Sequence, residues 1–155
     1  MTYENEAADW AKIPLLGALE YNVRRQIGFY GETKILRRDE VVFQQGEPSD
    51  GGYILLNGQV ELVAAERSIP PKMISPPALL GEMALLTQTI RPTTAIARAP
   101  SAVLKIPREL FQRMLKENPR SARQVRTLVE ARLTEFSQRM QAASADNFID
   151  APSVD

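Results

Sequence analysis

Between residues 81 and 97 the chain reads Gly81-Glu82-Met83-Ala84-Leu85-Leu86-Thr87-Gln88-Thr89-Ile90-Arg91-Pro92-Thr93-Thr94-Ala95-Ile96-Ala97, and this stretch decides how the fold is interpreted. A glycine precedes a short apolar segment that has the pattern of a helical turn, and one carboxylate, Glu82, stands at its start. Arg91 follows nine residues after Glu82, directly before an extended run rich in β-branched residues. The segment therefore combines a permissive backbone position, a hydrogen-bond acceptor and a cation.

These residue types suit an anionic ligand that also carries hydroxyl groups. Gly81 permits backbone torsions and a close backbone approach that other residues resist. The first amides of a helical turn are unpaired and can bind an anion, and Arg91 adds a planar fork of donors suited to a phosphate. Glu82 only accepts hydrogen bonds when it is ionised, so it requires hydroxyl or N–H donors. A ligand with one phosphate and a nearby sugar hydroxyl satisfies all three features.

The segment resembles the phosphate-binding cassette of the cyclic nucleotide-binding domain family. The usual form of that cassette is Phe-Gly-Glu-(Leu/Met)-Ala-Leu, a variable loop, and then Arg-(Ala/Ser/Thr)-Ala-Thr-(Val/Ile)-x-Ala. The family includes the regulatory subunits of cAMP-dependent protein kinase, bacterial catabolite activators and cyclic nucleotide-gated channels. The resemblance implies that Glu82 binds the ribose 2′-hydroxyl and that Arg91 binds the cyclic phosphate, with help from backbone amides around Gly81, Met83 and Ala84.

The chain departs from the family pattern at two positions of the cassette. Leu80 stands where an aromatic residue usually precedes the glycine. Pro92 follows the arginine, and proline lacks the N–H that helps to hold the phosphate in many family members. It also replaces the threonine that some cGMP-selective relatives carry there. Thr94, or Thr93 if the strand faces the other way, offers a hydroxyl to the ligand, and we expect cAMP before cGMP.

Composition excludes several other function classes. The 155 residues suit one domain, and equal numbers of basic and acidic residues, 19 of each, provide no overall attraction to nucleic acid or to an anionic membrane. The absence of cysteine and histidine excludes disulfide scaffolds, thiol catalysis, zinc fingers and histidine-based triads, and it argues against a metal-dependent cupin. No acid–base or nucleophile pair stands out, so we expect neither an enzyme nor a resident cofactor or metal.

The N-terminal region reads as helical and the central region as β. Apolar residues recur at spacings of three and four from Ala7 to about Phe29, with a break at Pro14. Short runs with strand character follow, separated by turn signals; they are Thr33–Leu36, Val41–Phe43, Tyr53–Leu56 and Gln59–Val63. Asn57-Gly58 between the last two predicts a tight hairpin. The proline-rich segment from Glu66 to Pro77 is expected to be an edge strand or a loop.

The last two strands are expected at Thr93–Ala97 and Ala102–Ile106, and Pro107 suits the first turn of a helix. Asn118-Pro119 is a good start for a second, long helix. Its apolar stripe consists of Val125, Leu128, Val129, Leu133, Phe136 and Met140. This stripe packs either on its own domain or on the same helix of a second copy, and bacterial relatives often dimerise in this way.

The predicted fold is a mainly β (α+β) antiparallel β-roll, or jelly roll, with flanking helices. Residues 1–31 form an N-terminal helical segment of the same domain, 32–106 the β-roll with the cassette at 81–94, 107–141 the C-terminal helices, and 142–155 a disordered tail. The resemblance spans about Ile13 to Leu133, since Gly46-Glu47 and the strand and glycine that follow also match the family pattern. The first residues, Met1 to Asp9, are acidic and polar and do not form a signal peptide, and we expect a cytoplasmic protein.

These observations leave two main functions open. The first is a bacterial sensor that binds a cyclic purine nucleotide, as a possible homodimer, and acts on an unknown protein effector through its C-terminal helix. The second is an interaction module with the same fold and a weak or lost nucleotide site. A DNA-binding regulator is a weaker alternative, because too few residues follow Met140 for a helix-turn-helix domain and the net charge is zero.

Overall fold

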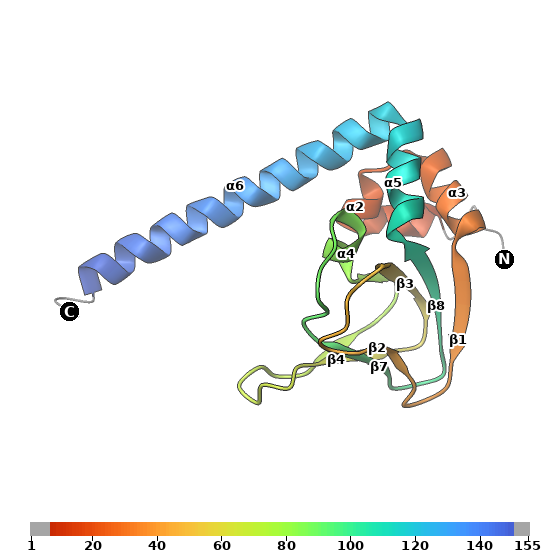
Figure 1. Ribbon diagram of the computed structural model, residues 1–155, viewed down its shortest axis with the longest axis horizontal. Helices are drawn as coiled ribbons and strands as arrows, with labels where there is room; N and C mark the ends of the chain where they lie inside the picture. Colours follow the sequence, from red (N-terminus) through yellow and green to blue (C-terminus); the bar gives the residue numbers. More distant parts are fainter. Residues whose placement is uncertain (1–6, 151–155) are drawn as a thin grey trace.

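The computed structural model describes residues 7–150, with side chains described through residue 143. Strands form a roll, and helices gather at one end of it (Figure 1). The elements follow in the order η1 (Trp10–Lys12), α2 (Pro14–Gly17), α3 (Tyr21–Tyr30), β1 (Glu32–Leu36), β2 (Val41–Phe43), β3 (Gly51–Asn57), β4 (Val60–Val63), β5 (Lys72–Ile74), β6 (Ala78–Leu80), α4 (Glu82–Leu86), β7 (Thr94–Ala97), β8 (Ser101–Pro107), α5 (Arg108–Glu117) and α6 (Pro119–Asp150). The predicted β-roll with flanking helices is confirmed.

The strands form two four-stranded sheets with the orders β1-β8-β3-β6 and β2-β7-β4-β5. Every pairing between these strands is antiparallel. Tyr53 and Leu55 of β3 pack inside the roll against Val60 of β4 and Val103 of β8. The roll therefore has its own small core between the two sheets.

The outer face of the first sheet carries the second, larger core. Because successive side chains of a strand point to opposite faces, Ile54 and Leu104 point away from the roll and pack against the helices. Phe111 of α5 and Leu85 of α4 are fully buried in the same cluster. The first sheet therefore lies between the interior of the roll and the helices, and it contacts both.

The hairpin predicted at Asn57-Gly58 is wrong. Gly58 does turn the chain sharply, with a φ of 93°, but β3 and β4 on either side of it belong to different sheets. β3 pairs with β6 and β8, and β4 pairs with β5 and β7. The tight turn is a local property, whereas the choice of partner strand is made by residues far away in the sequence.

Other strand predictions are confirmed. The proline-rich segment contributes β5, which is an edge strand of the second sheet, and the last two strands are β7 and β8. The short strand β6 was not predicted. It pairs with β3 only over Ala78–Leu80, immediately before the cassette. Three residues that follow two prolines give no clear periodic signal.

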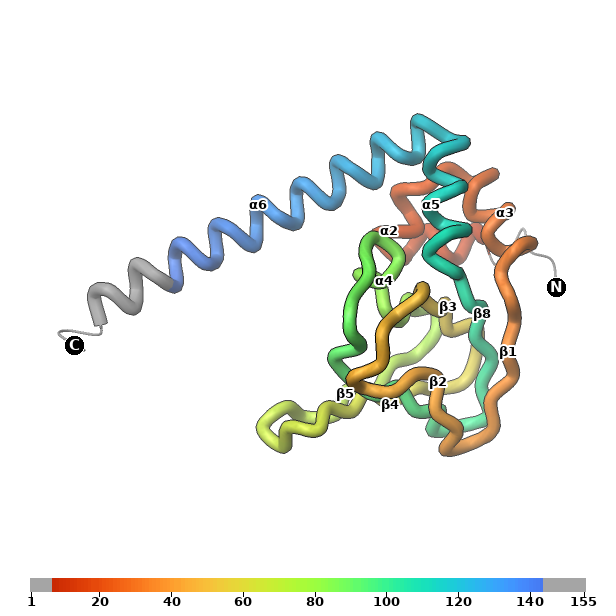
Figure 2. Tube along the Cα trace, viewed as in Figure 1, coloured from red at the N-terminus to blue at the C-terminus, as the bar shows by residue number. Residues whose placement is uncertain are grey.

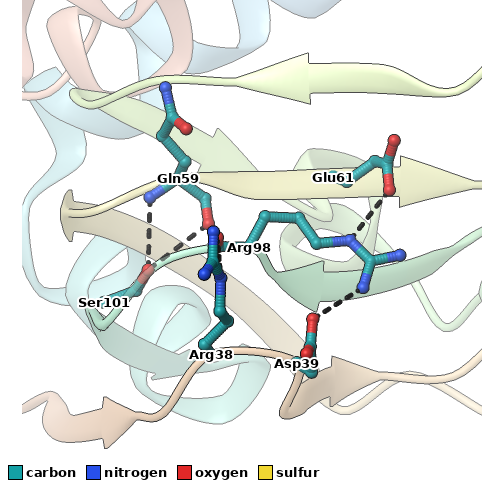
Figure 3. A network of polar contacts seen from close by, with 6 residues as sticks. All are labelled: Arg38, Asp39, Gln59, Glu61, Arg98 and Ser101. Atoms are coloured by element: carbon teal, nitrogen blue, oxygen red, sulfur yellow. Dashed lines mark hydrogen bonds and ion pairs between the residues drawn. The ribbon is translucent and has the colours of Figure 1, made fainter.

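A polar network connects the turn after β1, the start of β4 and the turn between β7 and β8 (Figure 3). Arg98 donates from Nε to Glu61 Oε1 and from Nη1 to Asp39 Oδ1, both at 2.9 Å. Arg38 donates to the carbonyl of Arg98 at 3.2 Å, and Ser101 Oγ accepts from the amide of Gln59 at 3.2 Å. None of these side chains lines the cavity described below, so we assign the network to the stability of the roll.

The two C-terminal helices are placed differently. The helix α5 packs against α3 and α4, whereas α6 projects away from the roll, as the tube trace also shows (Figure 2). The hydroxyl of Ser121, which is fully buried, accepts a hydrogen bond of 2.9 Å from the amide of Glu20 and fixes the start of α6. Over its 32 residues α6 is about 48 Å long.

The disordered tail predicted for residues 142–155 is corrected over most of its length. The helix α6 continues to Asp150, and residues 151–155 lie outside the described part of the chain. The segment that follows Met140 contains Ala142, Ala143 and Ala145, and alanine has the highest helix propensity of any residue. A started helix extends readily because each added residue gains one hydrogen bond.

Gly58 and Gly46 provide a matched test of the sharp turn. Both have positive φ, but a Cβ on Gly58 would lie 2.1 Å from Ser101 Oγ, whereas a Cβ on Gly46 meets nothing within 4 Å. We expect Gly46→Ala to lower the free energy of unfolding by about 1 kcal/mol, the cost of the left-handed backbone alone. Gly58→Ala should cost about 3 kcal/mol because steric overlap is added. Urea unfolding measures both, and equal losses would contradict the packing at Ser101.

Candidate functional site

A cavity of about 340 Å³ lies between the cassette and the second sheet. The turn before α4 and the first residues of α4 form one wall, and strands β4 and β5 form the other. Its lining consists of Phe43, Leu62, Lys72, Ile74, Leu79, Leu80, Gly81, Glu82, Met83, Ala84, Thr89, Arg91, Pro92 and Thr93. The lining is mainly apolar, with charged groups at Lys72, Glu82 and Arg91, which is the usual composition of a small-molecule site.

Arg91 lies at the base of this cavity and is only 4% exposed. Its Nη2 donates to the carbonyl of Gly51 at 2.7 Å. The guanidinium carbon lies 4.3 Å from the ring centroid of Phe43 and 5.8 Å from that of Tyr53. Electrostatic attraction between a cation and the face of an aromatic ring stabilises such an arrangement.

No carboxylate within the described part of the chain forms an ion pair with Arg91. Burial lowers the pKa of Arg91, while Tyr53, Asp50 and Glu47 act from further away to raise it. The guanidinium nevertheless keeps its proton, since the pKa of arginine is far above neutrality. A buried cation without a direct counter-charge is costly, so this position favours an anion in the adjacent cavity.

Gly81 is required at its position by the approach of Arg91. Its φ of 76° and ψ of 43° lie in the left-handed region. A Cβ added there would lie 2.4 Å from Nη1 of Arg91. Gly81 thus allows the guanidinium to reach the start of α4, where the chain turns into the helix.

Glu82 is the first residue of α4 and points toward the long C-terminal helix. It forms an ion pair with Nη1 of Arg132, a residue of α6. The ion pair is made by the buried Oε1 atom of Glu82. An ionised carboxylate has several acceptor sites on its two oxygens, so Glu82 can also accept a donor from a ligand.

The remaining cassette residues divide into those that line the cavity and one that does not. Met83 lines it with a side chain that is 58% exposed, and Ala84 lines it although its amide already donates to the carbonyl of Gly81 at 3.0 Å. Pro92 and Thr93 also line the cavity. Thr94 does not, and its Oγ1 accepts a hydrogen bond of 2.9 Å from the amide of Gln45. Of the two threonine alternatives, Thr93 is therefore the one beside the cavity.

Sequence reasoning missed two parts of this site. The apolar wall contains Leu62, Ile74 and Leu79, which read as ordinary strand residues and carry no separate signal. Arg132 carries no sequence signal that links it to the cassette, and only the fold brings it to Glu82. A count of helical turns from Pro119 predicts which face Arg132 occupies, but not which element that face meets.

In the part of the chain that the structure describes, no group of three or more His, Cys, Asp or Glu residues could hold a metal ion. Among residues 7–150, no helix combines the length and apolar composition needed to cross a membrane.

Comparisons with known proteins agree with this geometry. The family model of the cyclic nucleotide-binding domain matches residues 33–118, more than half of the chain. A cAMP-dependent protein kinase regulatory subunit from Pyricularia oryzae is 28% identical over 113 residues, which cover 73% of this chain and 28% of that protein. Lysophospholipase nte1 from Aspergillus fumigatus is 28% identical over 116 residues, 73% of this chain but 8% of that protein. The chain thus spans only a small part of these relatives.

Two solved structures show the same architecture. A cyclic nucleotide-binding-like protein from Brucella abortus has a TM-score of 0.64 and 30% identity, and the alignment covers 72% of this chain and 98% of that one. The N-terminal domain of a transcriptional regulator from Streptomyces coelicolor has a TM-score of 0.75 and 24% identity, with 84% and 93% covered. The resemblance found in the cassette is confirmed over the whole roll, and the chain belongs to the cyclic nucleotide-binding domain family.

Proposed function

We propose that this protein is a non-enzymatic sensor that binds a cyclic purine nucleotide, cAMP ahead of cGMP, and passes the state of the site to α6. One observation carries the proposal: the Arg91 guanidinium is 4% exposed, faces a cavity and has no carboxylate partner among the described residues. A cyclic phosphate would supply the negative charge that no described carboxylate places beside Arg91. Glu82, whose buried Oε1 atom forms the ion pair with Arg132, supplies the acceptor for the ribose 2′-hydroxyl.

The rest of the cavity supports a purine. Leu62, Ile74 and Leu79 offer an apolar wall to a planar base, and Lys72 can donate to N7, which adenine and guanine share. Guanine has O6 where adenine has its N6 amino group, and it carries the N2 amino group in addition, for which this wall has few partners. Position 92 is proline and offers neither a hydroxyl nor an N–H. These features favour adenine over guanine.

Nucleotide binding that depends on Arg91 is the test of the site. We expect calorimetry to show saturable binding of cAMP to protein that has been unfolded and refolded to remove any carried-over ligand. Arg91→Ala should raise the dissociation constant for cAMP at least about 100-fold, because a buried charge-assisted contact is lost. Arg126→Ala, at an exposed arginine of α6, removes the same charge and should change nothing.

The calorimetric result separates the two candidate functions. No heat with cAMP or cGMP would contradict the sensor and favour an interaction module with the same fold, which Pro92 and the exposed stripe of α6 support. Binding that survives Arg91→Ala would mean that the ligand is held elsewhere.

Transmission to α6 is supported by the ion pair between Glu82 and Arg132. We propose that a ribose hydroxyl on Glu82 competes with Arg132 for the same carboxylate. The ligand then weakens one of the contacts that hold α6 against α4. A ligand shifts a conformational equilibrium only when it binds the two conformations with different affinities, and this competition provides such a difference.

Removal of the competing cation should tighten binding. We expect Arg132→Met to lower the dissociation constant for cAMP about 2- to 5-fold, the range for a partly exposed ion pair. The side chains of Arg132 and Glu82 are 39% and 28% exposed. Arg126→Met is the matched control on the same helix. Weaker binding in Arg132→Met would contradict competition and would indicate that Arg132 contacts the ligand itself.

We further propose that α6 pairs with α6 of a second copy. Leu133, Phe136 and Met140 are 62%, 60% and 53% exposed, and they continue the apolar stripe beyond the partly buried Val129. The spacings from Val129 through these three residues are four, three and four, as in a coiled-coil seam. A groove of about 430 Å³ at the base of this stripe includes Met83 of the cassette and Leu86. A helix seated there would therefore lie next to the nucleotide cavity.

A charge placed in the stripe tests this pairing. We expect the wild type to sediment as a dimer and Phe136→Glu to sediment as a monomer, because a carboxylate would be buried in an apolar seam. Gln138→Glu adds the same charge at an exposed position outside the stripe and should leave the dimer intact. A monomeric wild type at the highest concentration measured would contradict the proposal.

A further inference from the structure

Arg108, the first residue of α5, joins that helix to the cassette helix α4 and to the segment before β3. We propose that Arg108 is the positioning residue through which an anion at Arg91 acts on α5 and, through it, on α6. This inference rests on the proposed function and deepens it, because it names a route from the phosphate to the helices that does not pass through Glu82 and Arg132.

The contacts of Arg108 reach two separate segments. Its Nε donates to the carbonyl of Ala84 in the cassette helix α4 at 2.7 Å. Its Nη2 donates to Ser49, at 2.6 Å to the carbonyl and 3.1 Å to Oγ. The amide of Arg108 also donates to the carbonyl of Asp50 at 2.7 Å. One side chain and its own backbone thus connect the start of α5 to the cassette and to the segment before β3.

Ser49 connects this point to the loop that precedes Arg91. The serine is 4% exposed, and its amide donates to the carbonyl of Thr89 at 2.8 Å. Its Oγ accepts from the amide of Thr89 at 3.1 Å and lies 2.9 Å from Thr89 Oγ1. Thr89 itself lines the cavity. Ser49 therefore holds the loop and Arg108 at the same time.

The carbonyl of Gly51, two residues after Ser49, accepts the hydrogen bond from Arg91. A phosphate that binds Arg91 competes with this carbonyl for the N–H donors of the guanidinium, because both are acceptors on one fork. It also attracts the start of α4. Both changes affect contacts of Arg108. A displacement of Gly51 reaches Arg108 through Asp50 and Ser49, and a displacement of α4 reaches it through the carbonyl of Ala84.

The geometry requires a guanidinium at position 108. Arginine presents its donors on a rigid planar fork, whereas lysine carries a single ammonium group on a flexible stem. Lysine can reach one of the two segments, but it cannot hold Ala84 and Ser49 in a fixed relation. Beyond Arg108, α5 contributes Phe111 to the core cluster that also contains Val125 of α6 and Leu85 of α4. A shift at the start of α5 is therefore passed on through close-packed side chains.

The test measures nucleotide binding and the position of α6 separately. The chain has no cysteine, so spin labels attach only at Thr33→Cys in β1 and Gln138→Cys in α6, both exposed positions. Labelled protein is diluted with unlabelled protein, and the distance distribution between the labels is measured with and without cAMP. The variants are Arg108→Met, Arg108→Lys and, as the matched control on α5, Lys116→Met at an exposed lysine.

We expect cAMP to shift the distance distribution of the wild type and of Lys116→Met. Arg108→Met should still bind cAMP, with a dissociation constant raised less than about tenfold, but its distribution should not shift. Arg108→Lys should fold and bind like the wild type and recover less than half of the shift. It keeps the inference testable if Arg108→Met does not fold. A purely structural role predicts instead a shift that remains in every variant that folds and binds.

The outcomes distinguish this inference from the proposed function. A wild type that binds no nucleotide would overturn both. Nucleotide binding with an undiminished shift in Arg108→Met or Arg108→Lys would overturn the role of Arg108 alone and leave the sensor intact.

Discussion

The structure depends on one buried cation, Arg91, that no described carboxylate neutralises. Arg91 is held from three directions, by the carbonyl of Gly51 and by the rings of Phe43 and Tyr53. None of these partners carries a negative charge, so the guanidinium keeps its attraction for an anion. The two conditions that make this position possible are the left-handed turn at Gly81 and the closed roll around it. The proposal of a site for an anionic ligand rests on this charge balance as much as on the shape of the cavity.

The same residues that form the cavity also contact the helices. The first sheet has the roll on one face and the helical core on the other, and β3 carries Tyr53 and Ile54 toward opposite sides. The cassette helix α4 lines the cavity through Met83 and Ala84, and it packs into the helical core through Leu85. We therefore expect a change at the proposed anion site to reach the helices, because close-packed elements on both sides share the same short segments.

The larger part of the fold was predictable because its signals are local. Alternating and β-branched runs gave most of the strands, Pro107 and Asn118-Pro119 gave the starts of α5 and α6, and the order of Gly81, Glu82 and Arg91 indicated the cavity. The predictions of a hairpin at Asn57-Gly58 and of a disordered tail failed, because each local pattern is compatible with more than one structure. The turn at Asn57-Gly58 is as tight as expected, but it joins two sheets. The segment after Met140 continues α6, because nothing in it stops a helix that has already formed.

The sequence by itself determined the family, the apolar faces of the helices and the residues of the cassette, since these depend on spacing along one segment. Only the tertiary structure decided that Arg91 pairs with none of the described carboxylates, that Thr93 rather than Thr94 borders the cavity, and that Glu82 meets Arg132. It also decided that Arg108 joins Ala84 to Ser49. The physical reason is that burial, charge pairing and partner choice arise between residues far apart in the chain, and no periodicity or spacing encodes which of them will meet.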